Sequence, residues 1–364
     1  METEVLRIIE GGLTNDKRKI IAYSTKLAER LSKEGNESLA KCILQKINTS
    51  IPQGQMVADA MRVIPLDVDS HLKIVEVYPS DEKRQPIVLD DTVEKKITDF
   101  INMIKHSSDL ELAGIDVKKT MLLYGQPGCG KTSIAHYVAE KTGLPLVVAR
   151  LDGVVSSLLG STAKNLRKIF EYAQSMPCIL FLDEFDAIAK ARDDAHELGE
   201  LKRVINSLLQ NIDGMRSDSI LIAATNHANL LDSAVWRRFV QVVEVGLPTE
   251  KQISEMIDVF ADPFTCDLVS DSQRKNIFVE SVLGHSPSDI KTIFDKVKVK
   301  SVIEGRKTIE TEELLLNVDD TTCLDKSDSE FVYFLSSHGM AQTEISKRTG
   351  ISLRKVKSYL STSR

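Results

Sequence analysis

Three short apolar runs, each followed by glycine or small polar residues, dominate the middle of the chain. They cover residues 121–124, 178–182 and 220–224. Strands of a parallel sheet that helices cover on both faces read as continuous apolar runs. The stretches 133–141 and 201–210, which lie between the runs, predict helices. This pattern predicts an α/β fold with a parallel sheet flanked by helices.

Helical patterns precede and follow this central region. Apolar positions at helical spacing near the start of the chain predict helices at 4–10, 15–31 and 37–47. Another helix begins after the sheet, at 251–260. We expect a helical hairpin or bundle at 1–50, a linker with a short strand (72–78) at 51–87, an α/β core at 88–250, a helical lid at 251–318 and a helix-turn-helix-like unit at 319–364.

The first apolar run leads into a glycine-rich segment that ends in lysine and threonine. Its residues are Gly125, Gln126, Pro127, Gly128, Cys129, Gly130, Lys131 and Thr132. Between a strand and a helix, such a segment curls so that its N–H groups point at phosphate oxygens. Lys131 would reach the β- and γ-phosphates of ATP, and the Thr132 hydroxyl would bind Mg²⁺. The alternative is a glycine turn that only joins strand and helix.

Two acidic residues follow the second run. Asp183 and Glu184 stand at the carboxyl end of the 178–182 strand, which is where open α/β sheets bind ligands. Asp183 would hold Mg²⁺ through water, and Glu184 would polarise the attacking water. A buried strand that merely ends in solvated acids is the alternative, but the two motifs in this order favour a nucleotide site.

Thr225 and Asn226 follow the third run, and Asn226 is a short polar residue suited to sense the γ-phosphate or the attacking water. Farther along, Arg237 and Arg238 stand side by side before Phe239. Two adjacent guanidinium groups can neutralise transition-state charge if they reach a phosphate. Ordinary surface charges are the alternative, and the position behind the sensor strand tells against it.

Together these segments resemble the AAA family of the AAA+ ATPases over roughly residues 88–305. GQPGCGKT, LFLDEFDAI, AATN and LDSAVWRRF occur in the family's order and spacing, and the arginine pair is similar to that of spastin-like members. The resemblance implies a P-loop NTPase core of the AAA+ type, ATP and Mg²⁺ as cofactors, ATP hydrolysis, and a homo-oligomeric ring that we expect to be a hexamer. In that ring Arg237 and Arg238 would act on ATP held by the neighbouring subunit. Residues 213–215 resemble the family's intersubunit signalling motif, with methionine in place of phenylalanine.

Two further assignments follow from the resemblance. Leu158, Leu159 and Gly160 occupy the position of the family's central pore loop, where an aromatic residue is usual, and this implies an aliphatic ring that grips a protein substrate. Gly160 and the next two residues would form a turn and a helix cap. The alternative is a helix-capping loop with two core leucines. Ser288, at the start of an expected helix, occupies the position where the family contacts adenine.

Composition limits the function classes. The net charge of −6 argues against broad binding of polyanions, and no apolar run approaches the length of a membrane span. The 5 cysteines are scattered and show no CxxC pairing, which fits a reduced compartment. We therefore expect a cytoplasmic protein without a membrane partner.

The last residues are patterned as a small helical unit. Helices are expected there at 329–336, 342–348 and 352–360. The turn between the last two gives a spacing that resembles a helix-turn-helix. Arg354, Lys355 and Lys357 would be exposed on the last helix, which could enter a DNA groove. The same fold also serves as a protein-docking module.

The preferred hypothesis is a ring-forming ATPase that remodels or unfolds protein. The whole chain is also similar to bacterial AAA proteins that accompany subtilisin-like serine proteases, and since the sequence shows no Ser-His-Asp motif, proteolysis would need such a partner. The alternative is a DNA-linked AAA+ ATPase, of the loader or transposition-helper type, that uses the C-terminal unit. A nucleotide-controlled scaffold is a third hypothesis.

Overall fold

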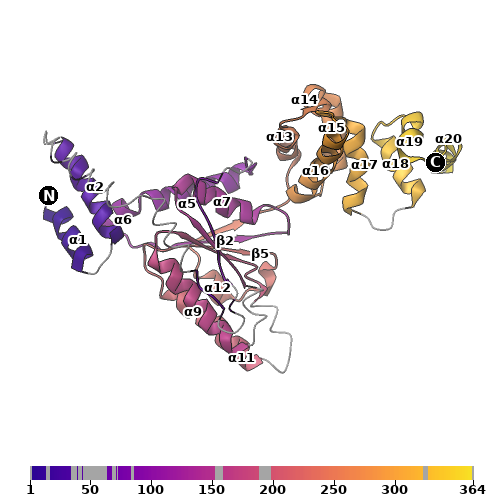
Figure 1. Cartoon of the computed structure of the whole chain (residues 1–364). Coiled ribbons are helices and arrows are strands. Elements are labelled where there is room, and N and C mark those ends of the chain that lie inside the picture. The colour runs from indigo at the N-terminus through magenta and orange to yellow at the C-terminus, as the bar shows by residue number, and fades with distance from the viewer. Residues whose placement is uncertain are drawn as a thin grey trace. The chain divides into compact units, whose positions relative to one another are not determined.

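The computed structural model describes residues 2–13, 17–33, 39, 43, 64–67, 71, 73–82, 86–151, 159–187, 198–322 and 327–362. A six-stranded sheet in the order β1-β3-β4-β5-β2-β6 forms the central layer (Figure 1). The strands are β1 (Glu76–Tyr78), β2 (Lys119–Tyr124), β3 (Leu146–Arg150), β4 (Ile179–Asp183), β5 (Ile220–Thr225) and β6 (Gln241–Glu244). Strands β3, β4 and β5 pair in parallel, and β1 adds an antiparallel edge to β3. The expected α/β fold with a mostly parallel sheet is confirmed.

The inner strands are apolar along their length because helices cover the sheet. Leu180 of β4 is fully buried and stands in register between Val147 of β3 and Leu221 of β5. The polar residues that follow these strands are therefore the first to reach solvent. Strand β1 lies in the segment expected to be a linker, and the expected domain boundaries stay predictions.

The chain forms two compact units, which are described separately. The first comprises Met1–Glu82, Ile97–Leu123 and Ala135–Val242, and the second Lys83–Lys96, Tyr124–Ile134 and Val243–Arg364. The helices that precede β6 are α1 (Glu2–Leu13), α2 (Lys17–Lys33), α5 (Asp91–Lys105), α6 (Ser107–Leu112), α7 (Lys131–Thr142), α9 (Leu159–Ser175), α11 (Leu198–Asp213), the 3-10 helix η2 (Ala228–Leu230) and α12 (Ser233–Trp236).

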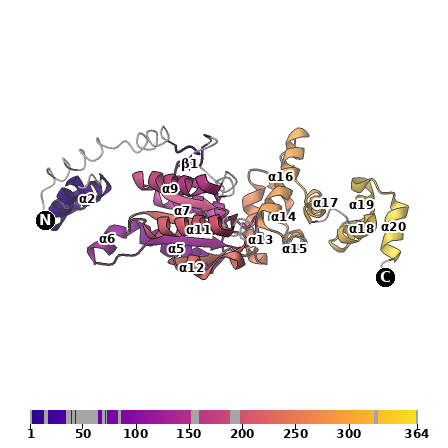
Figure 2. The same ribbon diagram turned by 90° about the horizontal axis from the view of Figure 1, so that it is seen from below.

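Helices α9 and α11 pack against each other and against the sheet (Figures 1 and 2). Phe170 of α9 and Leu208 of α11 share one hydrophobic core with Leu180 and Leu221. Helix α9 begins at Leu159, so the turn and cap expected at residues 160–162 are wrong. A helix tolerates glycine in its first turn, because the N–H groups there have no intrahelical acceptor in any case.

Two of the three helices expected near the amino terminus are present. Helices α1 and α2 pack together, and Tyr23, Ala28 and Leu31 of α2 are buried. The ammonium of Lys26 forms an ion pair with Asp109 of α6 at 2.6 Å. The third expected helix, at 37–47, lies outside the described residues apart from two isolated positions.

The second unit is mainly helical. Its elements after β6 are α13 (Glu250–Ala261), β7 (Thr265–Cys266), α14 (Asp267–Ser270), α15 (Ser272–Ser281), α16 (Pro287–Ile303), β8 (Thr308–Ile309), α17 (Thr311–Thr322), α18 (Asp328–Ser337), α19 (Gln342–Thr349) and α20 (Leu353–Thr362). Phe278 and Phe294 share one hydrophobic core with Val332, Ile345 and Val356 of the last three helices. The C-terminal helices thus share a core with α15 and α16.

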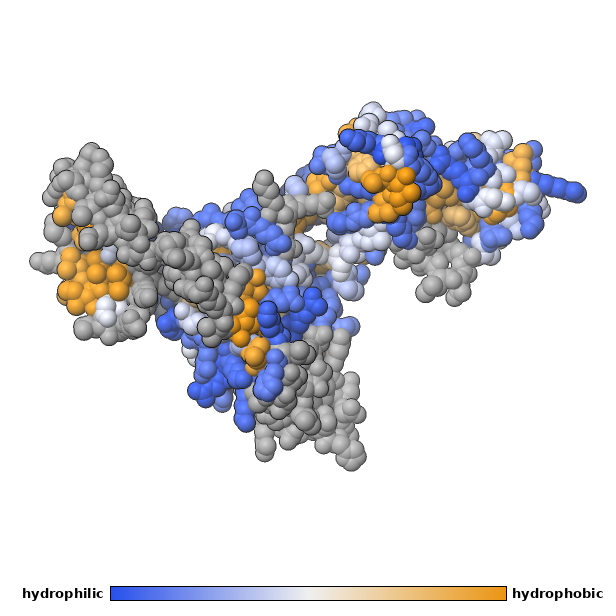
Figure 3. Space-filling view, viewed as in Figure 1, coloured by the Kyte–Doolittle hydropathy of each residue, from blue (hydrophilic) through white to orange (hydrophobic). Residues whose placement is uncertain are grey.

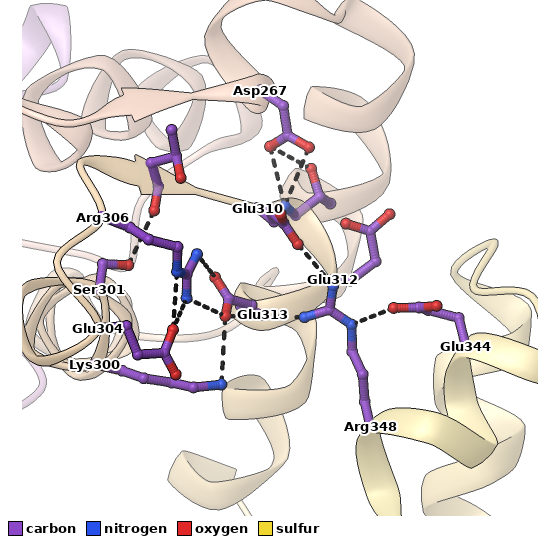
Figure 4. Close-up of polar contacts among 12 residues, drawn as sticks. Asp267, Lys300, Ser301, Glu304, Arg306, Glu310, Glu312, Glu313, Glu344 and Arg348 are labelled. Carbon is purple, nitrogen blue, oxygen red and sulfur yellow. Dashed lines mark hydrogen bonds and ion pairs between the residues drawn. The ribbon is translucent and has the colours of Figure 1, made fainter.

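Ion pairs reinforce this packing between α17 and the C-terminal helices (Figure 4). Arg348 of α19 binds Glu310 at 2.7 Å and Glu344 at 2.6 Å. Beside it, Arg306 binds the buried Glu313 at 2.9 Å. Burial alone would raise the pKa of Glu313, but the hydrogen bonds and charges of Arg306 and Lys300 outweigh it and lower that pKa. Glu313 is therefore ionised and stays paired at neutral pH.

The face of the second unit shown in Figure 3 is mostly hydrophilic, with several hydrophobic patches. Val299, Val302 and Ile303 are exposed near the end of α16. Exposed apolar groups that lie together commonly mark interaction sites. Among the described residues, no helix has the length and apolarity that crossing a membrane requires.

Candidate active site

The glycine-rich segment leaves β2 in a bend that only glycine allows at its first position. Gly125 has φ +147°, and a Cβ atom there would collide with the backbone oxygen of Val245. The next strand is held close at the same point, because the Val245 N–H donates to the Tyr124 oxygen at 2.7 Å. The sequence therefore specifies the loop's path from β2 into α7.

Lys131 opens helix α7 and turns back over the loop. Its ammonium donates to the carbonyl oxygens of Gly125 and Gln126, each at 2.8 Å, and the residue is only 7% exposed. The helix amino terminus and the lysine thus put positive charge at one place. This is the arrangement that a polyphosphate requires.

A cavity of about 360 Å³ lies beside this loop, within the second unit. That volume is in the range of small-ligand pockets. It is lined by residues from the segment before α5, the glycine-rich loop, the segment between β6 and α13, α13 itself and the start of α16, among them Leu89, Asp90, Cys129, Pro248, Met256 and Pro287. Burial raises the pKa of the Cys129 thiol, so this group stays protonated and neutral. A largely neutral wall next to a phosphate-type loop suits a nucleotide base.

The start of α16 touches the loop directly. Ser286 caps the helix and Pro287 is its first residue. The Ser288 N–H donates to the Gly128 oxygen at 3.2 Å, and a Cβ at Gly128 would collide with Ser286. Ser288 therefore meets the loop through its backbone, while Pro287 lines the cavity.

The acidic loop after β4, in the first unit, has an unusual backbone. Glu184 is exposed and has φ +53°, in the left-handed region. A side chain in that region costs about 1–2 kcal/mol, and such strain is concentrated at functional sites. The Asp183 carboxylate accepts the Glu184 N–H at 2.9 Å, and the Glu184 oxygen accepts the Ala187 N–H at 2.8 Å. These bonds fix the backbone of Glu184 at the end of the strand, where its side chain is exposed.

Asn226 follows β5 and is half-buried. Its N–H and the Thr225 hydroxyl both bond to Asp186, a buried acid that the sequence reading had passed over. The only signal for Asp186 was its place in the acidic run after β4. Because β4, β5 and β2 are consecutive in the sheet, the acids, the candidate sensor and the glycine-rich segment follow three neighbouring strands.

The two adjacent arginines have different surroundings. Arg238 donates to both carboxylate oxygens of Asp213, at 3.3 and 3.0 Å, and to the Ala234 oxygen at 2.7 Å. Arg237 is exposed, and its guanidinium pairs with no residue in the part of the chain that the structure describes. Arg237 is thus available to a group outside its own chain, whereas Arg238 is tied to the segment 213–215.

The candidate pore residues are only partly covered. Leu158 lies outside the described residues, and Leu159 and Gly160 open α9. Their role as a substrate contact stays a prediction.

A parallel sheet with a phosphate-type loop after β2 and acids after β4 defines the class of P-loop ATPases. Residues 121–247 match the family model described as ATPase family associated with various cellular activities (AAA). This chain belongs to that AAA family, and it is an ATPase.

Relatives extend the match beyond the ATPase segment. The protein named uncharacterized AAA family ATPase y4kL, from Sinorhizobium fredii (strain NBRC 101917 / NGR234), is 33% identical over 289 residues, which are 79% of this chain and 86% of that protein. Proteasome-activating nucleotidase of Methanococcus vannielii is 30% identical over 301 residues, 78% of this chain and 72% of that protein. The putative 26S proteasome regulatory subunit homolog MJ1494 of Methanocaldococcus jannaschii is 30% identical over 216 residues, 58% of this chain and 57% of that protein.

Proposed function

We propose that this chain assembles into a ring, expected to be a hexamer, and uses ATP hydrolysis to remodel or unfold proteins. The observation that carries the proposal is the match to proteasome-activating nucleotidase, which covers 72% of that protein and reaches well beyond residues 121–247. The exposed Arg237, which pairs with no residue that the structure describes, supports a ring, because a second subunit would give it a phosphate to contact. The exposed apolar residues at the end of α16 also suit a subunit contact.

Each group of residues has its own part in the proposed chemistry. Residues 125–132 would hold the phosphates of ATP, and Glu184 would take a proton from the attacking water. Asn226 would orient that water, and Arg237 would stabilise the charge that develops on a neighbour's γ-phosphate. Mg²⁺, when bound, would neutralise charge on the β- and γ-phosphate oxygens.

The residues present fit Mg²⁺ held together with a nucleotide. No group of three or more metal-ligating side chains occurs among the described residues. Mg²⁺ in ATPases binds through one or two protein oxygens and completes its shell with phosphate and water. Thr132 and Asp183 are the residues that we propose for those positions.

A partner protease is the finer part of this proposal. One relative is named for the activation of a proteasome, which is a protease complex, and this sequence shows no Ser-His-Asp motif of its own. We propose that the ring passes unfolded protein to a separate protease, such as a subtilisin-like one. A cytoplasmic location remains an expectation from the cysteine pattern.

The pore assignment has a direct test. Replacing Leu158 and Leu159 with serine is expected to leave basal ATP hydrolysis within about twofold and to abolish unfolding of a tagged substrate, because nucleotide and substrate bind at separate places. An unfoldase assay, an ATPase assay and a melting curve would be run on the same preparation. If the leucines are core residues instead, truncation should lower the free energy of unfolding by about 2–5 kcal/mol, and a destabilised, inactive protein would sink the assignment.

DNA binding is a second candidate function, and one observation favours it. Helices α18, α19 and α20 form a three-helix unit in which Gly350 ends α19 with φ +74°, as in a helix-turn-helix. Arg354, Lys355 and Lys357 are exposed on α20, and none of them pairs with an acid among the described residues. Arg348, in contrast, is neutralised by Glu310 and Glu344. The basic face of α20 would therefore meet phosphates.

This candidate predicts binding that depends steeply on salt. Changing the three basic residues of α20 to alanine should lower the slope of log K against log salt by about 3 and weaken binding to duplex DNA. This slope is measured by fluorescence anisotropy with a labelled duplex. The salt concentration is varied from about 50 to about 200 mM, where binding changes strongly. Lys95, Lys105 and Lys307 are exposed elsewhere and have no acid partner among the described residues, so they provide a control triple variant of equal charge. Equal losses in both variants, or no DNA binding at all, would leave protein docking as the role of α20.

A further inference from the structure

Asp186 joins the loop after β4 to the end of β5. Its side chain is buried, at 3% exposure, and Oδ1 accepts hydrogen bonds from the Thr225 hydroxyl at 2.9 Å and from the Asn226 N–H at 3.2 Å. The Thr225 hydroxyl oxygen in turn accepts the His227 N–H at 3.0 Å. Buried donors need acceptors, so this chain of bonds holds the residues after β5 in one arrangement.

The same loop is tied to β5 at a second point. The Phe185 N–H donates to the Ala224 oxygen at 2.8 Å, and the Phe185 side chain is buried against Phe239. Glu184, which has the left-handed backbone, immediately precedes these two ties. A glutamate keeps that conformation only where its surroundings impose it. The bonds of Phe185 and Asp186 to β5 supply that constraint.

We propose that Asp186 is a positioning residue of the ATPase reaction, which holds Glu184 and Asn226 in one fixed relation so that both address the same water. The proposal rests on the proposed roles of Glu184 as base and Asn226 as sensor. Asp186 acts through these neighbours. Its contact with Asn226 is made through the Asn226 backbone N–H, so this bond does not occupy the Asn226 side chain.

A buried acid that merely stabilises the fold would have the same burial and the same bonds, so the test must separate binding, turnover and stability. Asp186→Ala is expected to lower kcat by about 10- to 100-fold, the effect of misplacing a reacting group, while the Kd for ATP changes less than about threefold. Asp186→Asn keeps an acceptor oxygen of the same shape and should recover most of the turnover. Thr225→Val keeps the shape of a buried side chain, removes one donor, and should lower kcat with an unchanged Kd.

Asp67 provides the matched control. It is also a buried acid, at 4% exposure, and it is hydrogen-bonded to Asn165 of α9 rather than to β5. Asp67→Ala should lower the melting temperature about as much as Asp186→Ala and leave kcat within about twofold, since kcat follows the reacting groups and not global stability. The assays use the full-length chain, with ATP turnover, binding of a fluorescent ATP analogue and thermal melting measured on each variant.

Several outcomes would overturn the proposal. Unchanged kcat in Asp186→Ala would do so, as would an equal loss of kcat in Asp67→Ala or a parallel loss of ATP binding. If Asp186→Ala does not fold, Thr225→Val decides the question. Unchanged kcat in Thr225→Val overturns the proposal, and a lowered kcat with an unchanged Kd for ATP supports it. Glu184→Gln and Asn226→Ala are measured beside them, because full turnover in those two would show that the base and sensor assignments themselves are wrong.

Discussion

A Glu184→Gln variant is expected to bind ATP as tightly as the unaltered chain and to hydrolyse it roughly 10²–10⁴-fold more slowly, which is the contribution of a positioned general base. The glutamine side chain keeps the size of glutamate but cannot accept the proton from water. Glu184 is exposed at the end of β4, outside the hydrophobic core, so the change should not alter stability. Steady-state phosphate release and the Kd of a fluorescent ATP analogue measure the two effects.

Lys131→Ala is expected to affect ATP binding, whereas Glu184→Gln affects only hydrolysis. Because its ammonium supplies charge where the ground-state phosphates would bind, this variant should lose ATP binding itself. Glu171→Gln, on the exposed face of α9, is the matched control and should change neither quantity. Unchanged turnover in Glu184→Gln would remove Glu184 from the mechanism. Proteins that co-purify with the Glu184→Gln chain in the presence of ATP would identify candidate substrates.

Arg237→Ala is expected to bind ATP normally and to hydrolyse it about 10³-fold or more slowly, which is the contribution of an arginine finger to kcat. Substitutions at the two arginines should lower hydrolysis for different reasons. Arg238 already pairs with Asp213, so Arg238→Ala should act by loosening that contact, and Asp213→Asn should reproduce its effect. Arg237→Lys should not restore activity, because an ammonium cannot replace a planar guanidinium at a bidentate site.

Mixed rings decide whether Arg237 acts between subunits. Lys131→Ala subunits lack ATP binding but carry an intact Arg237, and Arg237→Ala subunits have the reverse defect. Mixing two inactive preparations should therefore restore measurable hydrolysis, because some interfaces then combine an intact P-loop with an intact arginine. Failure to recover activity, once co-assembly has been proven, would mean that Arg237 does not act in trans.

The strands could be predicted from sequence because burial on both faces leaves continuous apolar runs, as at Leu180 and Leu221. The glycine-rich loop was equally predictable, since Gly125 sits where any Cβ would collide with a neighbouring strand. Asp186 could not be assigned in this way. Its role depends on which atoms of β5 come within reach, and a tertiary contact of this kind leaves no periodic signal along the chain.

The arginine pair shows the same limit. In the sequence Arg237 and Arg238 are equivalent neighbours, and only the fold reveals that one is tied to Asp213 while the other is exposed.

The C-terminal helices were also predicted in place and length, but the core that they share with α15 and α16 was not. Apolar faces indicate that a helix packs, without indicating on what.

That shared core gives the C-terminal helices a mechanical connection to the nucleotide loop. Ser288 at the start of α16 bonds to Gly128, and α16 shares the hydrophobic core that includes Val356 of α20. A close-packed body of this kind transmits displacement instead of absorbing it. Any ligand bound to α20 whose affinity depends on the nucleotide state must change ATP affinity by the same factor. The affinity of α20 for its partner would then depend on whether ATP is bound, and binding of the partner could in turn change the rate of ATP hydrolysis.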